Sequence, residues 1–123
     1  MICTRNRADR LSKSLQSVSA AIRAHPEIPS EVIVVDNGST DRTPAVLRSW
    51  VESQDHPIKL AVEPTPGLAR ARNKALESVG NDVIAMTDDD CEVRVDYLLR
   101  LAQAHAAEAR PAVIGGRIEL GDP

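Results

Sequence analysis

Three consecutive aspartates, Asp88, Asp89 and Asp90, are the residues of this sequence that most clearly suggest chemistry. They follow a short apolar run, 83–86, which is typical of a strand buried on both faces of a sheet. Adjacent carboxylates repel one another, so they are either solvated, as in an acidic turn before a helix, or balanced by basic side chains or a divalent cation. Because alternate residues of an extended segment point the same way, Asp88 and Asp90 are expected to face one ion. Hard oxygen ligands of this kind suit Mg²⁺ or Mn²⁺ held together with substrate phosphates.

Length, net charge and cysteine content exclude several classes of protein. The 123 residues are enough for one compact domain, so we treat 1–123 as a single domain. A formal net charge of -3 argues against a nucleic-acid partner and against a membrane surface. Two cysteines without metal-site spacing argue against a disulfide framework and a zinc site. The sequence shows neither a long apolar run nor a signal-peptide pattern, so we expect a cytoplasmic domain, with any membrane segment outside this stretch.

Predicted strands and helices alternate along the chain. Apolar and β-branched runs predict strands at residues 1–3, 31–36, 58–62, 82–87 and 112–120. Helical periodicity predicts helices that begin near Asp9, Thr43, Leu68 and Val95, the last of them ending near Ala107. In the last helix, Tyr97, Leu98, Leu101 and Ala102 are expected to be buried. Alternation of this kind predicts an α/β, Rossmann-like fold with a mostly parallel sheet and helices on both faces.

Polar residues gather at three of the expected strand ends: 4–7, 36–41 and 88–90. Ligands of parallel α/β sheets bind at the carboxyl ends of the strands, near the point where the strand order switches. A sugar nucleotide bound there needs positive charge at its diphosphate, a group that reads its base and an acceptor for its ribose. The three clusters therefore predict one ligand site along this edge.

Individual side chains have both a functional and an ordinary interpretation. Asp36 could read a base N–H, or it could cap the following turn through an Asx contact. Arg5, Arg70 and Arg72 are candidates for base stacking or phosphate contact, although the last two lie on a predicted helix and could simply be solvated. Asn73 is equally well explained as a ligand or as a hydrogen bonder on the side of that helix.

Four motifs give the sequence a specific resemblance. They are Cys3-Thr4-Arg5-Asn6-Arg7, Val34-Val35-Asp36-Asn37-Gly38-Ser39-Thr40-Asp41, Pro66-Gly67-Leu68 with Ala71-Arg72-Asn73, and Thr87-Asp88-Asp89-Asp90. In this order and spacing the chain resembles the nucleotide-binding half of inverting family 2 glycosyltransferases with the GT-A fold. The resemblance covers essentially the whole chain.

The resemblance implies a site for a nucleotide-diphospho-sugar, with a UDP-sugar favoured, that uses Mn²⁺ or Mg²⁺. Its implied substrate-binding residues are Thr4, Arg5, Asn6, Asp36, Asn37, Gly67, Arg72, Asn73, Asp88 and Asp89. Asp90 and Asp88 match the ends of the family's Asp-x-Asp motif and are the implied metal ligands. Asn37 stands where the family usually has a second aspartate, and an amide can donate as well as accept a hydrogen bond.

Two departures from the family pattern concern the ends of the chain. The first strand is cut to Met1, Ile2 and Cys3, and the sequence stops at Pro123, where the acceptor-binding half should begin. No residue matches the family's general base, which inverting transfer needs, so this base is expected beyond Pro123. We therefore expect a donor-binding fragment, truncated at both ends.

Three alternative functions remain to be compared with a donor-binding role. The first is a non-catalytic nucleotide-binding or interaction module that lacks the acceptor half and the general base. A nucleotidyltransferase is disfavoured because the loop 4–7 contains no glycine. A receiver-type signalling domain is disfavoured because it needs a lysine late in the chain, and none follows Lys74.

Overall fold

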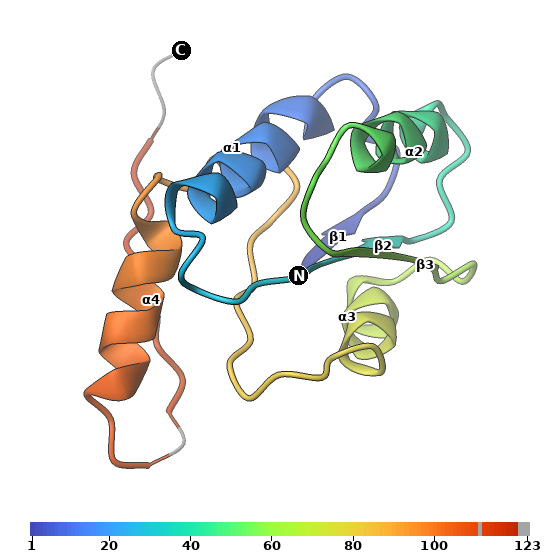
Figure 1. Cartoon of the computed structure of the whole chain (residues 1–123). Helices are drawn as coiled ribbons and strands as arrows, with labels where there is room; N and C mark the ends of the chain where they lie inside the picture. Colours follow the sequence, from blue (N-terminus) through green and yellow to red (C-terminus); the bar gives the residue numbers. More distant parts are fainter. Residues whose placement is uncertain (111, 121–123) are drawn as a thin grey trace.

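The computed structural model describes residues 1–110 and 112–120, and its centre is a parallel sheet with the strand order β1-β2-β3 (Figure 1). β1 spans Ile2–Thr4, β2 spans Val32–Asp36 and β3 spans Ile58–Val62. Every residue of β2 is buried, as expected for a central parallel strand of β-branched residues. The parallel sheet of the predicted α/β fold is confirmed.

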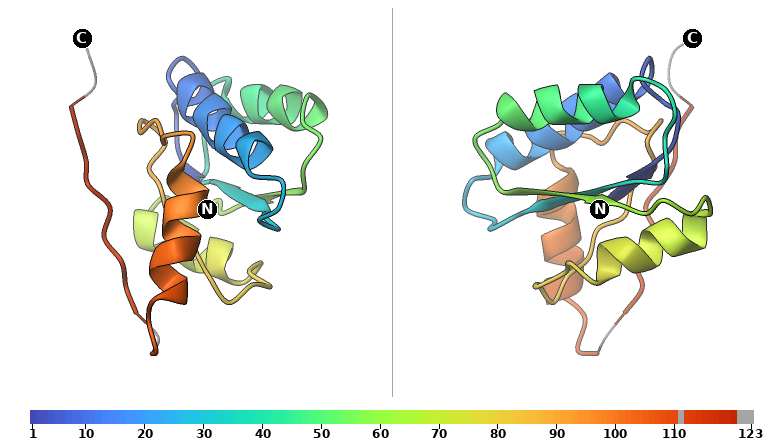
Figure 2. Two further views of the ribbon diagram at one scale, coloured as in Figure 1. Left: turned by 60° about the vertical axis from the view of Figure 1, so that its left-hand side comes forward. Right: turned by 90° about the vertical axis from the view of Figure 1, so that its right-hand side faces the viewer.

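Helices cover both faces of the sheet, as the sequence predicts. α1 (Leu11–Ala24) and α2 (Thr43–Glu52) lie on one face, α3 (Leu68–Leu76) lies on the other, and α4 (Tyr97–Ala106) stands beside α1 (Figure 2). In the part of the chain that the structure describes, no helix combines the length and the apolar character needed to cross a bilayer.

Each face of the sheet has its own apolar core. On one face, α1 and α2 pack on β1 and β2 through Ile2, Leu11, Leu15, Val32, Val34, Leu47 and Trp50. On the other face, Ala71 and Ala75 of α3 pack against Ile33 and Val35 of β2. The two cores fix the carboxyl ends of β1 and β2 relative to the starts of α1 and α3.

The prediction of a buried strand at 82–87 is wrong, because the segment is not a strand and most of its residues are exposed. The segment runs beside β1, where the amino group of Met1 donates to the carbonyl of Ala85 and the N–H of Thr87 donates to the carbonyl of Met1 at 3.3 Å. Among the described residues, Met1 alone exchanges backbone hydrogen bonds with this segment, and two such bonds do not make a regular ladder. Val83 and Met86 are consequently 44% and 56% exposed.

The last third of the chain is also less buried than predicted. The inward face expected of α4 is only half-buried, because this helix packs mainly on α1 and stands away from the sheet. The predicted strand 112–120 is wrong, since these residues pair with no strand in the described ranges, and Val113 and Leu120 are fully exposed.

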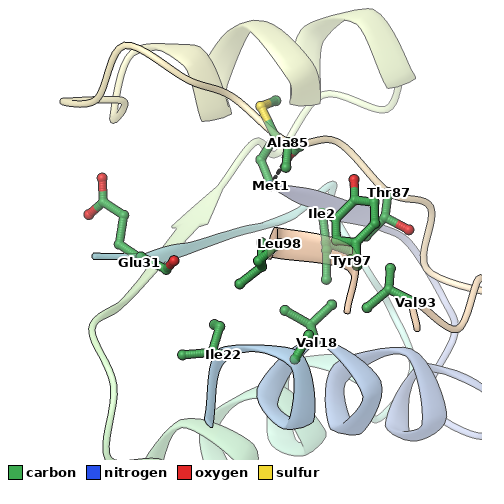
Figure 3. A pocket seen from close by; sticks show the side chains of 12 residues that line it. Met1, Ile2, Val18, Ile22, Glu31, Ala85, Thr87, Val93, Tyr97 and Leu98 are labelled. Carbon is green, nitrogen blue, oxygen red and sulfur yellow. Dashed lines mark hydrogen bonds between the residues drawn. The ribbon is translucent and has the colours of Figure 1, made fainter. Parts of the chain in front are cut away.

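An apolar pocket of about 60 Å³ remains where α4 stands away from the sheet. Ile2 of β1, Val18 and Ile22 of α1, and Tyr97 and Leu98 of α4 surround it, while the side chain of Met1 turns away toward α3 (Figure 3). Burial in this pocket raises the pKa of the Tyr97 hydroxyl. The pocket shows that α4 does not close over β1 as α1 does.

Candidate functional site

The loops that follow β1 and β2 are tied together by Asn6, and Asp36 shapes the second of these loops from within. Asn6 Oδ1 accepts a hydrogen bond from the N–H of Thr40 at 2.8 Å, and the Asn6 N–H donates to Ser39 Oγ at 3.0 Å. Asn6 has a φ of 54°, in the left-handed region that asparagine tolerates better than most residues. Asp36 Oδ1 accepts from the Ser39 N–H at 3.0 Å, so the Asx contact that its sequence position suggested is present.

Asn37 joins the loop after β2 to the loop before α3. Its side chain is buried, and Nδ2 donates to the carbonyls of Glu63 at 3.0 Å and Thr65 at 2.8 Å. Its Oδ1 accepts from the N–H of Gly67 at 2.8 Å. A carboxylate could not donate the first two bonds, which explains why an amide suits this position here. Asn37 acts on the site through the position of Gly67.

Gly38 brings the same two loops into backbone contact. Its φ is +66°, and a Cβ atom built on it would lie 2.7 Å from the carbonyl oxygen of Pro64. Both facts require glycine, because a side chain would be strained and would collide with backbone. The loops after β2 and β3 therefore form one packed surface beside Asp36.

The acidic triplet forms a turn and not the extended segment that its position after a predicted strand suggested. Residues 89–90 turn, and the N–H of Cys91 donates to the carbonyl of Asp88 at 3.3 Å. The premise that Asp88 and Asp90 share one side of an extended backbone is therefore wrong. The side chain of Asp89 is mostly buried, at 12% exposed, whereas those of Asp88 and Asp90 are 67% and 52% exposed.

Two arginines from different elements face this acidic turn. Arg7 Nε lies 3.6 Å from Asp89 Oδ1, and its Nη2 lies 3.9 Å from Asp90 Oδ2. Arg72 of α3 places its Nη2 3.7 Å from Asp88 Oδ1. Three carboxylates are thus set against two guanidinium groups. Sequence reasoning missed Arg7 as a site residue, because nothing in the local sequence pairs it with residues 89 and 90.

Two serines of α1 hold the backbone of the acidic turn. Ser14 Oγ donates to the carbonyl of Asp88 at 3.2 Å, and Ser17 Oγ accepts from the N–H of Val93 at 3.0 Å. Ser14 is fully buried beside Leu15. Sequence reasoning missed both serines, although a small polar residue inside the apolar face of a helix is a usable signal for such a contact.

The end of β1 lies between these clusters. The Thr4 hydroxyl is buried and has no hydrogen-bond partner among residues 1–110 and 112–120, so a ligand could supply one. Burial raises the pKa of the neighbouring Cys3 thiol, while Arg72 opposes this rise and Asp88 and Asp89 add to it. Cys3 is therefore within electrostatic reach of both Arg72 on α3 and the acidic turn.

Arg5 and Asn73 are not brought into this contact network. Both are exposed, and their side chains make no hydrogen bond or ion pair within the described ranges. Arg5 follows the buried Thr4, and Asn73 follows Arg72 on α3, so both remain next to the site in sequence. Arg70, one turn before Asn73, is exposed as well.

The acidic turn fits a divalent cation that a ligand helps to coordinate. The described residues contain no group of three or more His, Cys, Asp or Glu that could enclose a metal ion. Asp88 and Asp90 nevertheless present exposed carboxylate oxygens, which are hard donors. Mg²⁺ is commonly bound by one or two carboxylates together with substrate phosphates, so this donor set suits such a shared site and not an all-protein cage.

Known proteins are similar to this chain along nearly its whole length. The family model described as glycosyl transferase family 2 matches residues 1–122. Glycosyltransferase AglE of Haloferax volcanii is 29% identical over 118 residues, which are 96% of this chain and 38% of that protein. The uncharacterized glycosyltransferase YfnE of Bacillus subtilis is 32% identical over 89% of this chain and 27% of its own length. The chain thus spans well under half the length of these curated relatives.

A solved structure supports the fold. The crystal structure of S. aureus TarS 1-349 superposes with a TM-score of 0.72, covering 83% of this chain and 30% of that one at 24% identity. At this identity the likeness shows the fold alone, which is the GT-A fold that the four motifs implied. Together with the family match over nearly every residue, these findings show that the chain belongs to glycosyl transferase family 2.

Proposed function

We propose that the carboxyl edge of this sheet binds a nucleotide-diphospho-sugar, with a UDP-sugar favoured, together with Mn²⁺ or Mg²⁺. One observation carries the proposal: side chains of the loops after β1 and β2 join these loops to the start of α3 and to the acidic turn. Asn6 links the first loop to the second, Asn37 links the second to the start of α3, and Arg7 links the first loop to the acidic turn.

Each predicted residue has a role in this proposal. Asp36 reads the base, the unpartnered Thr4 hydroxyl bonds to the nucleoside, and Asp88 holds the ribose. Asp90, with Asp88, holds the cation. A divalent cation bound there would offset the negative charge that develops on the departing diphosphate.

The remaining predicted residues surround the phosphates. Arg72 is close enough to the acidic turn to exchange its contact with Asp88 for a phosphate oxygen. Arg5 and Asn73 are exposed beside the site and would order against the nucleotide. The backbone at Gly67, with a φ of 148°, lets the chain enter α3 where the ligand would lie.

For the whole enzyme we propose transfer of the sugar to an acceptor hydroxyl with inversion at the anomeric carbon. Inverting transfer needs a general base that takes the proton of the attacking hydroxyl. We expect that base to be a carboxylate outside residues 1–123, on the acceptor-binding half. The two free cysteines, Cys3 and Cys91, suit the reducing cytoplasm that we propose as the location of this site.

Calorimetric titration of UDP into the chain tests the donor site. We expect binding with Mn²⁺ present, loss of binding when a chelator is added, and loss in Asp90→Ala. The control variant is Asp55→Ala, because Asp55 is an exposed aspartate outside the site and its loss should leave binding unchanged. UDP binding that is equally strong in chelator and in Asp90→Ala would contradict the metal role of the triplet.

The alternative function is a non-catalytic nucleotide-binding or interaction module. It would use the same loop contacts of Asn6, Asn37 and Arg7 to hold a nucleotide without transferring a sugar. Sugar-transfer assays on a protein extended at both ends would separate the two functions. Metal-dependent UDP binding without any transfer or donor hydrolysis by the extended protein would favour the module.

A further inference from the structure

We propose, building on the cation site proposed above, that Arg7 is an internal counter-cation of the acidic turn. It pairs with Asp89 and Asp90 when no donor is bound, competes there with the divalent cation, and is released to the diphosphate when the donor arrives. Arg7 would therefore make cation binding depend on the nucleotide.

The backbone of Arg7 is fixed, while its guanidinium is not. The Arg7 N–H donates to Thr43 Oγ1 at 2.9 Å, and Thr43 is fully buried at the start of α2. The Arg7 carbonyl accepts from the N–H groups of Arg10 and Leu11, both at 2.9 Å, at the start of α1. The side chain thus leaves a rigid point and reaches the turn with 39% of its surface exposed.

The two ion pairs of Arg7 are loose enough to be exchanged. At 3.6 Å to Asp89 and 3.9 Å to Asp90, both contacts are longer than hydrogen bonds. Partly exposed ion pairs of this kind stabilise weakly. Asp89 is mostly buried and keeps the greater need for a positive partner, whereas Asp90 is half exposed and is open to a cation from solvent.

Because of its position, the guanidinium of Arg7 would compete with the divalent cation for Asp90 before the donor binds. After the donor binds, it would pair with the diphosphate. A dication at Asp90 would lie close to the guanidinium and be repelled by it. A bound diphosphate would bring negative charge that attracts both positive groups, so the repulsion would be offset. Cation and nucleotide would then increase each other's affinity, and this coupling is reciprocal. Arg72 faces only Asp88, so Asp90 has no second arginine among its ion pairs.

Electron paramagnetic resonance of free Mn²⁺ measures this competition directly, without sugar transfer. The chain, Arg7→Gln and the control Arg10→Gln are titrated with Mn²⁺, first without nucleotide and then with saturating UDP. Arg10 is exposed in the same loop region and forms none of the described ion pairs, so its loss controls for net charge. We expect Arg7→Gln to bind Mn²⁺ about two- to fivefold more tightly without UDP, the scale of an exposed ion pair.

With UDP present, Arg7→Gln should lose most of the increase in Mn²⁺ affinity that the nucleotide gives to the unaltered chain. An unchanged or weaker Mn²⁺ affinity without UDP would overturn the proposal, and so would an equal gain in Arg10→Gln. If Arg7→Gln does not keep the circular dichroism spectrum of the fold, Arg7→Lys replaces it. A smaller gain is expected there, because an ammonium group reaches one carboxylate, and no gain would overturn the proposal.

Asp90→Asn distinguishes the failure of this proposal from the failure of the cation site itself. If the chain binds Mn²⁺ and Asp90→Asn does not, the cation site is supported. The arginine variants then test the role of Arg7 separately. If neither the chain nor Asp90→Asn binds Mn²⁺ specifically, both the cation site and the role of Arg7 are overturned.

Discussion

Residues 83–120 contain a larger share of apolar residues than residues 1–76, yet their apolar side chains are far less buried. In the first region, Leu15 and Val34 are fully buried between a helix and a sheet. In the second region, Met86 and Val113 are 56% and 102% exposed. The difference lies in packing partners and not in propensity. α1 and α2 pack on strands of the sheet, whereas the backbone of the segment 83–87 is bonded to the sheet through Met1.

This comparison shows how little the second region can contribute to stability. Apolar surface stabilises a fold only where another element removes it from water. α4 packs mainly on α1 and leaves a pocket over β1. The acidic turn nevertheless keeps a defined place, because Ser14 and Ser17 connect it to the first region.

The largest expected contrast is between two truncations in these regions. Leu15→Ala should lower the free energy of unfolding by about 3 kcal/mol, because a fully buried leucine leaves a cavity. Met86→Ala should lower it by less than about 1 kcal/mol, since more than half of that side chain is already in water. Urea unfolding measures both variants, and similar losses would break the comparison.

A pair of glycines gives the next contrast. Gly38→Ala should cost about 2 kcal/mol, because the position has a φ of +66° and its Cβ would meet the Pro64 carbonyl oxygen at 2.7 Å. The matched control is Gly80→Ala, between the two regions, where an added Cβ meets nothing within 4 Å. Thermal unfolding of both variants is the measurement. A Gly38→Ala chain as stable as the control would contradict the close approach of the two loops.

Hydrogen bonds within the first region should matter more than the one that links the regions. Asn37→Asp keeps the acceptor for Gly67 but loses both donated bonds, and should cost about 2 kcal/mol by leaving buried carbonyls without partners. Ser14→Ala removes one bond to Asp88 and should cost about 1 kcal/mol. Chemical unfolding at neutral pH compares the two. A greater loss in Ser14→Ala would mean that the acidic turn supports the core.

The smallest expected effects are changes in folding stability at low pH. Hydrogen bonds from Thr43, first its hydroxyl and then its backbone N–H, hold the pKa of Asp41 below its usual range. In the second region, hydrogen bonds from Arg100 and then Arg94 lower the pKa of Asp96. A carboxyl with a lowered folded-state pKa stabilises the fold above its unfolded pKa of about 4, and this stability is lost as the pH falls through the lower folded value.

Acid titration of two variants separates these causes. Asp41→Asn and Asp96→Asn should each lose less stability than the unaltered chain as the pH falls from about 5 to about 2. High salt should reduce the effect at Asp96, where charged arginines are the cause, more than at Asp41, where neutral donors are the cause. Circular dichroism follows the transition. An equal response to salt at both residues would contradict the assignment.

The sequence predicted the first region well because its signals are local. The β-branched run of β2 and the apolar face containing Leu11 and Leu15 identify their own burial, and both are confirmed. The sequence also identified the family and the fold, through four motifs that occur in fixed order.

The second region could not be predicted in the same way. The run 83–86 has the composition of a buried strand, but burial depends on a partner elsewhere in the chain, and only Met1 lies beside it. The contacts of Arg7 with residues 89 and 90, and of Ser14 with residue 88, join positions far apart in the sequence. No local pattern records such pairs, whereas the roles proposed for Asp36, Asp88 and Asp90 remain predictions.

The hydrogen bonds of Ser14 and Ser17 couple the position of the acidic turn to the position of α1. Ser14 and Ser17 of α1 are hydrogen-bonded to the backbone of the acidic turn at Asp88 and just after it at Val93. A displacement of α1 would therefore displace the turn as well, whereas Asp36 belongs to β2 and would stay with the sheet. Any sliding or tilting of α1 over β2 therefore changes the separation between the carboxylate proposed for the base and those proposed for the ribose and the cation. The packing of Leu11 and Leu15 against the sheet holds α1 in place, and it therefore also fixes that separation.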